Sequence, residues 1–465
     1  MTATSNEELI KRIARLARQN QELEVEIKKL EKLAEKLSKE NERLRSLSGL
    51  SEKEAAVESD RKDKSARFNM TTVLYADIQG FTKVGENAYS VSLMDELDEI
   101  LYEFDAIAAR FKLEKIKTIG DTFMVAGGIP VKNITNPVDV VVAALEMRYF
   151  LEKYDRNKRG NNKQVWHLKT GIHTGPVTAS FTGKKKINYD IKGDTVNTAS
   201  RLEAVSENGS ILISVMTYEL VKEFFDCEYA GKLPVRYKGD LQMYRVKGLK
   251  PELSVNGDGF VPDVSFNIKR GLIQFTDIQE IILDKLEKEL PDYLYYHNVK
   301  HTVDVVTEVE LIGWAEGCSD EEILLLKTAA LFHDAGHTVS YDDHEYHSTL
   351  LAKELLPGFG YTPEQIETIC SVIMATKLPP RPANLLDEII CDSDLDYLGR
   401  SDFIPVSNTL FEELKAQNKM SELNEWNKLQ VKFISGHQYF TKTARSLREV
   451  NKQIQIERIQ SLIKD

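Results

Sequence analysis

The first fifty residues carry a heptad repeat, and this repeat constrains the fold of the chain more than any other feature. Leu at one heptad position with Ile at the complementary one favours two parallel helices, and a buried Asn there fixes the register. The repeat therefore predicts a parallel, homodimeric coiled coil over residues 1–48. A solitary amphipathic helix is the weaker interpretation, because a stripe this narrow suits no globular face. The leucines are Leu9, Leu16, Leu23, Leu30, Leu37 and Leu44, and the complementary positions hold Asn6, Ile13, Asn20, Ile27, Ala34 and Asn41.

The rest of the chain divides by pattern into two further domains. A polar stretch over 49–69 is expected to be a linker, and residues 70–250 alternate between strand and helix signals. A second linker, rich in Gly, Pro, Asn and Asp, is expected over 251–270, and residues 271–465 read as helical throughout. The total of 465 residues agrees with about three structural units.

Composition excludes several classes of protein. Apolar residues make up 42% of the chain, but no apolar run approaches the roughly 20 residues that span a bilayer. The net charge of −12 argues against nucleic-acid binding, which needs a basic surface. The N-terminus is too charged for a secretory signal, and the four cysteines form no CxxC pair, so a reduced, cytoplasmic location is expected.

In the middle domain, two aspartates stand at the ends of predicted strands. Asp77 ends the strand TTVLYADI, and Asp121 lies at the tip of the hairpin 114–128, which also carries Lys117. Such a pair suits a hard cation such as Mg²⁺, although ordinary loop aspartates are the alternative. After Asp77, Gly80 allows the backbone to bend so that the amides of residues 79–82 face an anion.

The secondary-structure pattern of this domain is α+β. Helices are expected over 90–111, 137–154 and 194–205, and strands over 165–174 and 177–181. A final hairpin is expected through 229–246. We expect the helices to be segregated from an antiparallel sheet.

Four motifs of this domain, DIQGFT, EKIKTIGD, GIHTGPV and YDIKGDTVNTASRLE, resemble those of class III nucleotidyl cyclases over about residues 72–246. The resemblance implies a ferredoxin-like α+β fold and a head-to-tail dimer with its active sites between the protomers. It implies that Asp77, Asp121 and the carbonyl of Ile78 bind two Mg²⁺ or Mn²⁺ ions, and that the turn of Gly80, Phe81 and Thr82 contacts substrate. The residues implied on the partner are Lys117 and Asp190 for the base, Asn197 for the ribose, and Arg201 and Lys238 for the triphosphate, with Arg236 and Lys232 as neighbouring alternatives to Lys238.

The base-reading pair also follows from chemistry. Adenine presents an acceptor at N1 and a donor at its 6-amino group, which a Lys donor and an Asp acceptor match. Guanine has the reverse pattern, and guanylyl members of the family carry Glu and a small Cys-like residue where Lys117 and Asp190 stand. ATP is therefore the expected substrate, and 3′,5′-cyclic AMP with pyrophosphate the expected products.

The C-terminal domain contains seven of the nine histidines. His297 and His301 are spaced to share one helical face, and LFHDAGH places His333 beside Asp334. His and Asp are suitable ligands for Zn²⁺, Mn²⁺ or Fe²⁺. Together with DSDLD, which contains Asp394, these pairs are difficult to explain as packing.

These motifs resemble the HD phosphohydrolase superfamily. The resemblance implies that His301, His333, Asp334 and Asp394 bind metal, with Asp392 as the alternative last ligand. The segment YHNVKH is also similar to cyclic-nucleotide phosphodiesterases, which implies that His297 is a general acid. One or two metals are expected, with the second taken by His337, His344 and His347.

The sequence therefore predicts a homodimeric adenylyl cyclase joined to a metal-dependent phosphohydrolase. The hydrolase substrate is cAMP or another phosphoester, or the domain regulates the cyclase. The alternative is a catalytically silent dimeric module that binds nucleotide without turnover.

Overall fold

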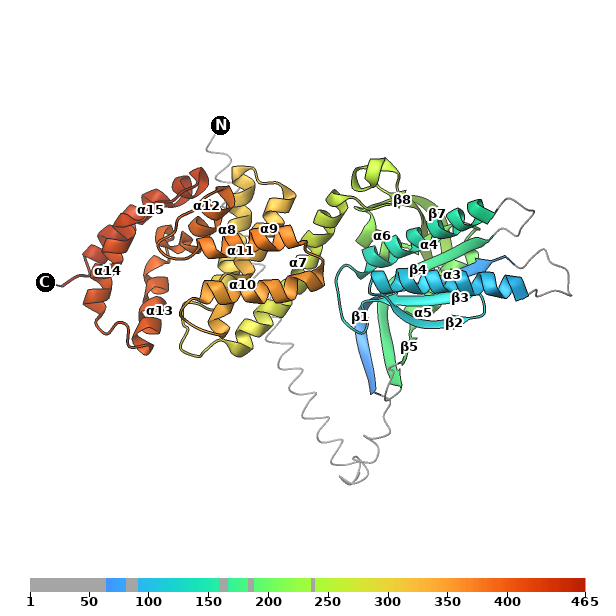
Figure 1. Cartoon of the computed structure of the whole chain (residues 1–465). Helices are drawn as coiled ribbons and strands as arrows, with labels where there is room; N and C mark the ends of the chain where they lie inside the picture. The colour runs from blue at the N-terminus through green and yellow to red at the C-terminus, as the bar shows by residue number, and fades with distance from the viewer. Residues whose placement is uncertain (1–63, 81–90, 159–165, 183–187, 236–238, 465) are drawn as a thin grey trace, which may run out of the picture. The chain divides into compact units, whose positions relative to one another are not determined.

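The computed structural model describes residues 64–464, apart from 81–90, 159–165, 183–187 and 236–238. The predicted coiled coil and residues 49–63 of the predicted first linker lie outside the described residues, and so do Phe81, Thr82 and Lys238. Residues 64–69, predicted as the end of that linker, belong instead to the first strand of the sheet. One compact unit spans Ala66–Ala179 and Tyr189–Asp465. Along the chain, a domain built on a sheet (the sheet domain, Lys64–Leu249) precedes a domain built from helices (the helical domain, Val264–Lys464), as Figure 1 shows.

The sheet domain is built on an eight-stranded sheet in the order β2-β3-β1-β4-β6-β8-β7, with β5 paired to β4. Strand pairs β1–β3, β2–β3, β6–β8 and β7–β8 are antiparallel, but β4 and β6 run parallel. The prediction of an antiparallel sheet was therefore wrong at this point, because the helix α5 (Asp194–Val205) returns the chain between β4 and β6. The strands are β1 (Lys64–Gln79), β2 (Glu114–Ile119), β3 (Thr122–Gly127), β4 (His167–Thr182), β5 (Asn188–Lys192), β6 (Ile211–Ser214), β7 (Phe225–Val235) and β8 (Gly239–Leu249).

Strand β4 is continuous where the sequence predicts two strands. Gly175 and Pro176 break the hydrophobic pattern, but the φ of proline is compatible with extended backbone. Thr195 of α5 donates a hydrogen bond to the carbonyl of Pro176 at 2.7 Å. Gly175 leaves room for this contact, because a Cβ there would lie 2.7 Å from Thr195 Oγ1.

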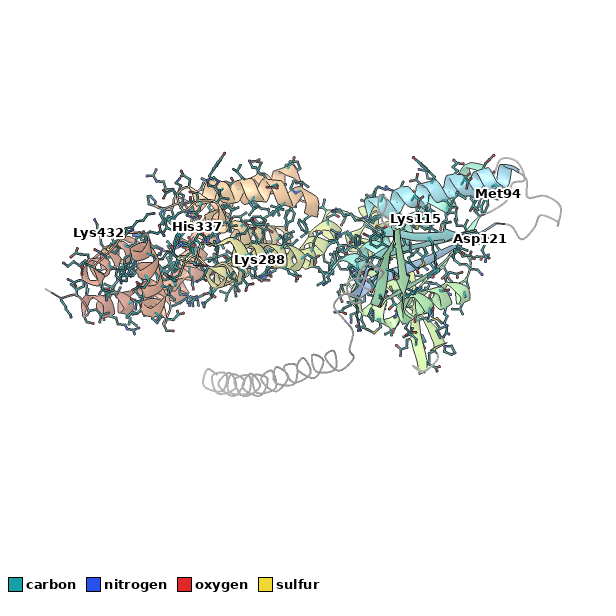
Figure 2. The ribbon with its side chains drawn as sticks, turned by 90° about the horizontal axis from the view of Figure 1, so that it is seen from below. Met94, Lys115, Asp121, Lys288, His337 and Lys432 are labelled. Carbon is teal, nitrogen blue, oxygen red and sulfur yellow. The ribbon has the colours of Figure 1, made fainter. Side chains whose placement is uncertain are left out.

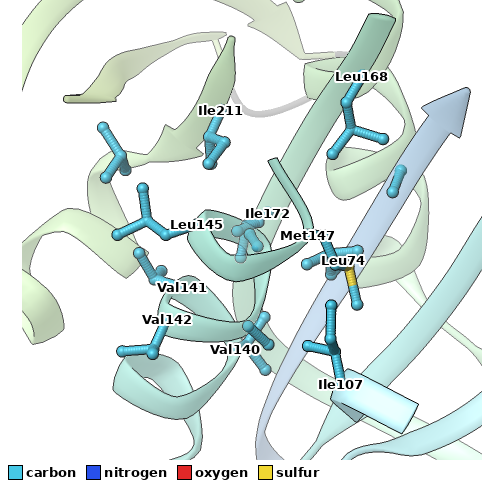
Figure 3. Close-up of a cluster of buried hydrophobic side chains, with 14 of the residues drawn as sticks. Leu74, Ile107, Val140, Val141, Val142, Leu145, Met147, Leu168, Ile172 and Ile211 are labelled. Carbon is cyan, nitrogen blue, oxygen red and sulfur yellow. The ribbon is translucent and has the colours of Figure 1, made fainter. Parts of the chain in front are cut away.

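Helices α3 (Val91–Arg110) and α4 (Asn136–Lys158) contribute to the large core of the sheet domain. Figure 3 shows part of this core, with Val140, Val141 and Leu145 of α4 near Ile172 of β4. Strand side chains alternate between faces, and the neighbouring Gly171 faces α5 at such close range that a Cβ would lie 2.1 Å from the backbone nitrogen of Glu203. Helix α5 therefore packs closely on β4 at Gly171. A short helix, α6 (Val215–Val221), follows β6.

The helical domain confirms the prediction of a helical C-terminal part. Helix α7 begins at Val264, ahead of the predicted boundary at 271, and runs to Glu289. It contributes Phe266 to the core of the sheet domain and Phe275 to the core of the helical domain. The remaining helices are α8 (Val299–Glu316), α9 (Asp320–Phe332), α10 (His344–Leu355), α11 (Pro363–Ala375), α12 (Leu385–Asp394), α13 (Phe403–Ala416), α14 (Leu423–Gly436) and α15 (Lys442–Gln460).

The helices of this domain start where the sequence supplies caps. Ser319 and Glu322 form a reciprocal capping box at the start of α9, and Thr362 and Gln365 form another at α11. All four cysteines are free thiols. In the part of the chain that the structure describes, no helix is long and apolar enough to cross a membrane.

Candidate nucleotide and metal sites

Asp77 and Asp121 lie side by side at one end of the sheet. Asp77 is opposite Thr122 in the β1–β3 pairing, and the backbone N–H of Ile78 donates to the carbonyl of Asp121 at 3.0 Å. Figure 2 shows Asp121 on this part of the sheet domain. Asp77 accepts hydrogen bonds from Gln79 Nε2 at 2.9 Å and from Thr122 Oγ1 at 3.3 Å. Two aspartates 44 positions apart in sequence thus come together through strand pairing.

The electrostatics of this pair favour a cation. Burial and the neighbouring charge of Asp77 raise the pKa of Asp121. A third carboxylate, Glu203 of α5, has its pKa raised to about 7 by burial and by Asp77 and Asp121, against the opposing effect of Lys169. Carboxylates that repel one another are stabilised by a divalent ion, and oxygen ligands are those that Mg²⁺ prefers. The aspartates therefore fit the expected metals, and sequence reasoning had not identified Glu203.

The turn after Asp77 requires glycine at position 80. A Cβ on Gly80 would lie 2.4 Å from Cε3 of Trp166, so any larger residue would displace the indole ring. Trp166 is buried, and its Nε1 donates to Glu96 at 3.1 Å. Packing against Trp166 thus constrains the backbone at Gly80.

The four described residues that the resemblance assigns to the partner protomer lie on three elements. Lys117 is on β2, Asp190 on β5, and Asn197 and Arg201 one turn apart on α5. All four side chains are exposed. Asp190 lies 3.8 Å from the ammonium of Lys192, an exposed pair, and contributes with burial to the raised pKa of Tyr75. Among the described contacts of this single chain, none joins these four side chains to the Asp77 and Asp121 pair.

In the helical domain, His301, His333 and Asp394 form a first histidine group. His301 Nε2 lies 3.0 Å from Asp394 Oδ1 and 3.4 Å from His333 Nε2. The Nδ1 of His333 lies 2.7 Å from the carbonyl of Ala330. A carbonyl only accepts, so Nδ1 carries the proton and Nε2 presents its lone pair to the group, as a metal-binding imidazole requires.

A second histidine group consists of His297, Asp334 and His337. Its member Asp334 also contacts the first group. Its Oδ2 is 3.2 Å from His333 Nε2, whereas its Oδ1 is 3.4 Å from His344 Nε2 and 4.0 Å from His337 Nε2. The rings of His337 and His344 stack with centroids 3.9 Å apart. His344 and His347, which were expected to share the second site with His337, are in neither group.

Buried polar atoms without partners indicate that these groups fit a metal. Asp334 Oδ2 and both ring nitrogens of His337 are buried and make no hydrogen bond in the described structure. Figure 2 shows His337 inside the helical domain. Burial lowers the pKa of His337 to about 2, so its ring is neutral and its nitrogens are available as ligands. Buried polar atoms normally have a partner, and a divalent transition metal would supply one here.

Glu413 of α13 holds His297 in place, and sequence reasoning missed it. Glu413 is fully buried and accepts hydrogen bonds from the backbone N–H groups of Tyr296 at 2.9 Å and His297 at 3.1 Å. Its other oxygen lies 2.5 Å from His297 Nδ1. Burial would lower the pKa of His297, but the hydrogen bond to Glu413 and the nearby carboxylates raise it. No motif marks Glu413, because it is 116 residues from its partner.

Asp394 and Asp392 have different surroundings. Asp394 lies within the first histidine group, whereas Asp392 is buried and accepts hydrogen bonds from Phe440 and Thr441, the latter through both N–H and Oγ1. Asp392 therefore ties the end of α12 to the turn before α15.

Comparison with protein families assigns both domains. Residues 64–248 match the family model for the adenylate and guanylate cyclase catalytic domain. Residues 298–397 match the HD domain model, and this range includes His301, His333, Asp334 and Asp394. The chain therefore contains a class III cyclase catalytic domain followed by an HD domain, which confirms the two predicted families.

Individual relatives match the cyclase part. The receptor-type guanylate cyclase gcy-8 of Caenorhabditis elegans is 37% identical over 189 residues, which are 40% of this chain and 16% of that protein. An adenylate cyclase of Mycobacterium bovis is 32% identical over 42% of this chain and 44% of that protein. The solved adenylyl cyclase CyaB of P. aeruginosa is 32% identical, covering 39% of this chain and 95% of that one, with a TM-score of 0.37. The chain thus spans less than half of these two curated relatives, which include both nucleotide classes.

Proposed function

We propose that the protein is an adenylyl cyclase that converts ATP to 3′,5′-cyclic AMP and pyrophosphate at the interface of a cytoplasmic homodimer. The observation that carries the proposal is the position of Asp77 beside Asp121 at the sheet end, where burial and the charge of Asp77 raise the pKa of Asp121. The exposed positions of Lys117, Asp190, Asn197 and Arg201 support a site completed by a second copy. We assign the dimer contacts to the cyclase domain and to a coiled coil over residues 1–48.

In this proposal, one protomer supplies the metal ligands and its partner supplies the residues that bind the nucleotide. Asp77, Asp121 and the carbonyl of Ile78 hold two Mg²⁺ or Mn²⁺ ions, which when bound activate the 3′-hydroxyl and screen the leaving pyrophosphate. From the partner copy, Lys117 donates to adenine N1 and Asp190 accepts from the 6-amino group.

The same partner copy supplies the polar groups for the sugar and the phosphates. Asn197 orients the ribose, and Arg201, with Lys238, stabilises charge that develops on the triphosphate. The turn at Gly80, Phe81 and Thr82 turns its amides toward the phosphates.

An assay of the full chain with ATP or GTP and Mg²⁺ or Mn²⁺ tests the cyclase proposal. We expect cAMP from ATP and at least tenfold less cGMP from GTP, because a buried polar mismatch at the base is costly. A folded dimer that binds ATP but forms no cyclic nucleotide would instead establish the silent nucleotide-binding module.

For the HD domain we propose metal-dependent hydrolysis of a phosphoester, cAMP or another. His301, His333, Asp334 and Asp394 would hold one ion of Zn²⁺, Mn²⁺ or Fe²⁺, and His337 with His344 would hold a second, which leaves His297 outside the metal ligands. When bound, these ions would provide a nucleophilic hydroxide at neutral pH. His297, oriented and kept protonated by Glu413, donates a proton to the leaving oxygen. Elemental analysis of carefully purified protein should find transition metal, and its absence from an active preparation would contradict the proposal.

A further inference from the structure

A cavity of about 530 Å³ lies at the end of α14 in the helical domain. Its lining comes from the loop after α11, from the residue that follows α12, and from the segment that joins α14 to α15. No member of the two histidine groups lines it. Its volume is within the range for small-molecule pockets, about 300–1,000 Å³. The cavity therefore has the size for one small organic ligand.

Most of the cavity wall is apolar. The ring of Phe433 and the ring of His437, which also lines the cavity, have centroids 6.5 Å apart and are inclined by 29°. Flat apolar side chains of this kind favour an aromatic ring as their neighbour. The apolar wall consists of Pro379, Pro380, Leu395, Leu429, Phe433 and Phe440.

The charge of the cavity is positive. Among the described residues, Lys432 is the one permanently charged side chain in the lining, and no carboxylate accompanies it. Figure 2 shows Lys432 on the helical domain. One turn earlier on α14, Lys428 pairs with Glu425 at 2.9 Å, whereas no residue that the structure describes pairs with the ammonium of Lys432. An anion in the cavity would therefore meet a cation that no carboxylate neutralises.

His437 gives the cavity a second polar group without a partner. Its side chain is buried, and neither ring nitrogen makes a hydrogen bond within the described residues. Burial, with a smaller effect of Lys452, lowers the pKa of His437 to about 4, so the ring is neutral at pH 7 and has one N–H to donate. Because buried polar atoms normally have a partner, this ring indicates that a further molecule completes the site.

We propose that this cavity binds a compact organic anion with an aromatic ring and a single carboxylate. The ring of the ligand lies against Phe433, Phe440 and the two prolines, and the carboxylate pairs with Lys432 and accepts the N–H of His437. One cation balances one negative charge, so a second charge on the ligand would be unfavourable. The proposal is independent of the cyclase and hydrolase functions proposed above.

Calorimetric titration of the full chain at pH 7.5 tests the proposal. The probes are 1-naphthoate, its uncharged counterpart 1-naphthamide, and the dianion naphthalene-1,4-dicarboxylate. We expect 1-naphthoate to bind about tenfold more tightly than either of the others, because hydrogen bonds to an ionised group are roughly twice as strong as neutral ones. No binding of 1-naphthoate would overturn the proposal, and so would equal affinity for the acid and the amide.

Two variants locate the binding. Gly436 lines the cavity and a Cβ there meets nothing within 4 Å, so Gly436→Leu should fold and abolish binding of 1-naphthoate, whereas Gly358→Leu, equally open but outside the cavity, should not. Lys432→Met, an exposed change, should weaken binding of the acid about tenfold and leave the amide unaffected. Lys428→Met is its control, because Lys428 pairs with Glu425 and does not line the cavity. Binding of 1-naphthoate that is unchanged in Lys432→Met or in a folded Gly436→Leu variant would contradict the proposal.

Discussion

At the residue scale, the cyclase proposal depends on which side chains read the base. Lys117 and Asp190 lie on strands β2 and β5, and both are exposed in the single chain. Their types were read directly from the motifs, and the donor and acceptor pattern of adenine explains them. The place of Glu203 beside the two aspartates could not be predicted from a motif. Its pKa is raised by burial and by the charges of Asp77 and Asp121, which come near it only in the folded chain.

Exchange of the base-reading pair should alter nucleotide selectivity. In the double variant Lys117→Glu with Asp190→Cys, the ratio of kcat/KM for ATP to that for GTP should fall at least tenfold, because the remaining groups no longer match adenine. Steady-state kinetics with both nucleotides measures the ratio. Lys222→Glu, an exposed change elsewhere on the cyclase domain, is the control. Undiminished ATP selectivity in the double variant would refute the base-reading role.

Removal of the charge on Glu413 should impair the HD domain at the chemical step. In Glu413→Gln the side chain no longer supports a protonated His297, so kcat for phosphoester hydrolysis should fall by about 10²-fold or more. Metal content, measured by elemental analysis, should stay close to that of the wild type. A variant that lost its metal and its activity together would indicate a purely structural role for Glu413.

At the element scale, the sequence predicted regular structure well where periodicity was strong. Helix α5 has the predicted bounds Asp194–Val205, but β4 is one strand across Gly175 and Pro176, where local turn signals predicted two. The parallel pairing of β4 with β6 depends on how α5 returns the chain, and no short motif records it. Tertiary packing decided these features.

The close approach of α5 to β4 predicts a sensitive glycine. In Gly171→Ala the new methyl group would meet the α5 backbone, so the variant should lose about 3 kcal/mol or more of stability. Because α5 carries Asn197 and Arg201, cyclase activity should fall further than hydrolase activity. Thermal unfolding and both assays check this, with Gly358→Ala, where a Cβ meets nothing within 4 Å, as the control. A Gly171 variant with wild-type cyclase activity would contradict the packing argument.

The turn after α14 should make the helical domain sensitive to acid. Burial, with a smaller effect of Lys452, lowers the pKa of His437 from 6.5 to about 4. Between these values the unfolded chain binds the proton and the folded chain does not, so this contribution to stability is complete above pH 6.5 and is lost as pH falls toward 4.

Between neutral pH and pH 5, the free energy of unfolding should fall by about 2 kcal/mol because of His437. Denaturant unfolding of the wild type and of His437→Phe at pH 7.5 and pH 5 measures it. The wild type should lose that much more stability than the variant over this interval. Equal losses would show that His437 is not held neutral in the folded chain.

At the scale of the whole molecule, one chain carries a cyclase catalytic domain and an HD domain. The order of motifs predicted both families, and the structure brings the histidines of the HD domain together within single chains. The cyclase site differs, because Asp77 and Asp121 are adjacent while the predicted nucleotide contacts remain exposed. This difference supports the central proposal, that one chain supplies halves of two different cyclase sites.

Complementation between two inactive variants tests that claim most directly. Asp121→Asn removes a metal ligand and Arg201→Ala removes a phosphate contact, so each variant alone should form almost no cAMP. In a co-expressed mixture, half of the dimers pair the two variants, and each of these has one intact site of two, so about a quarter of wild-type activity should return. A mixture as inactive as its components would contradict the shared site, and so would a wild-type chain that is fully active as a monomer.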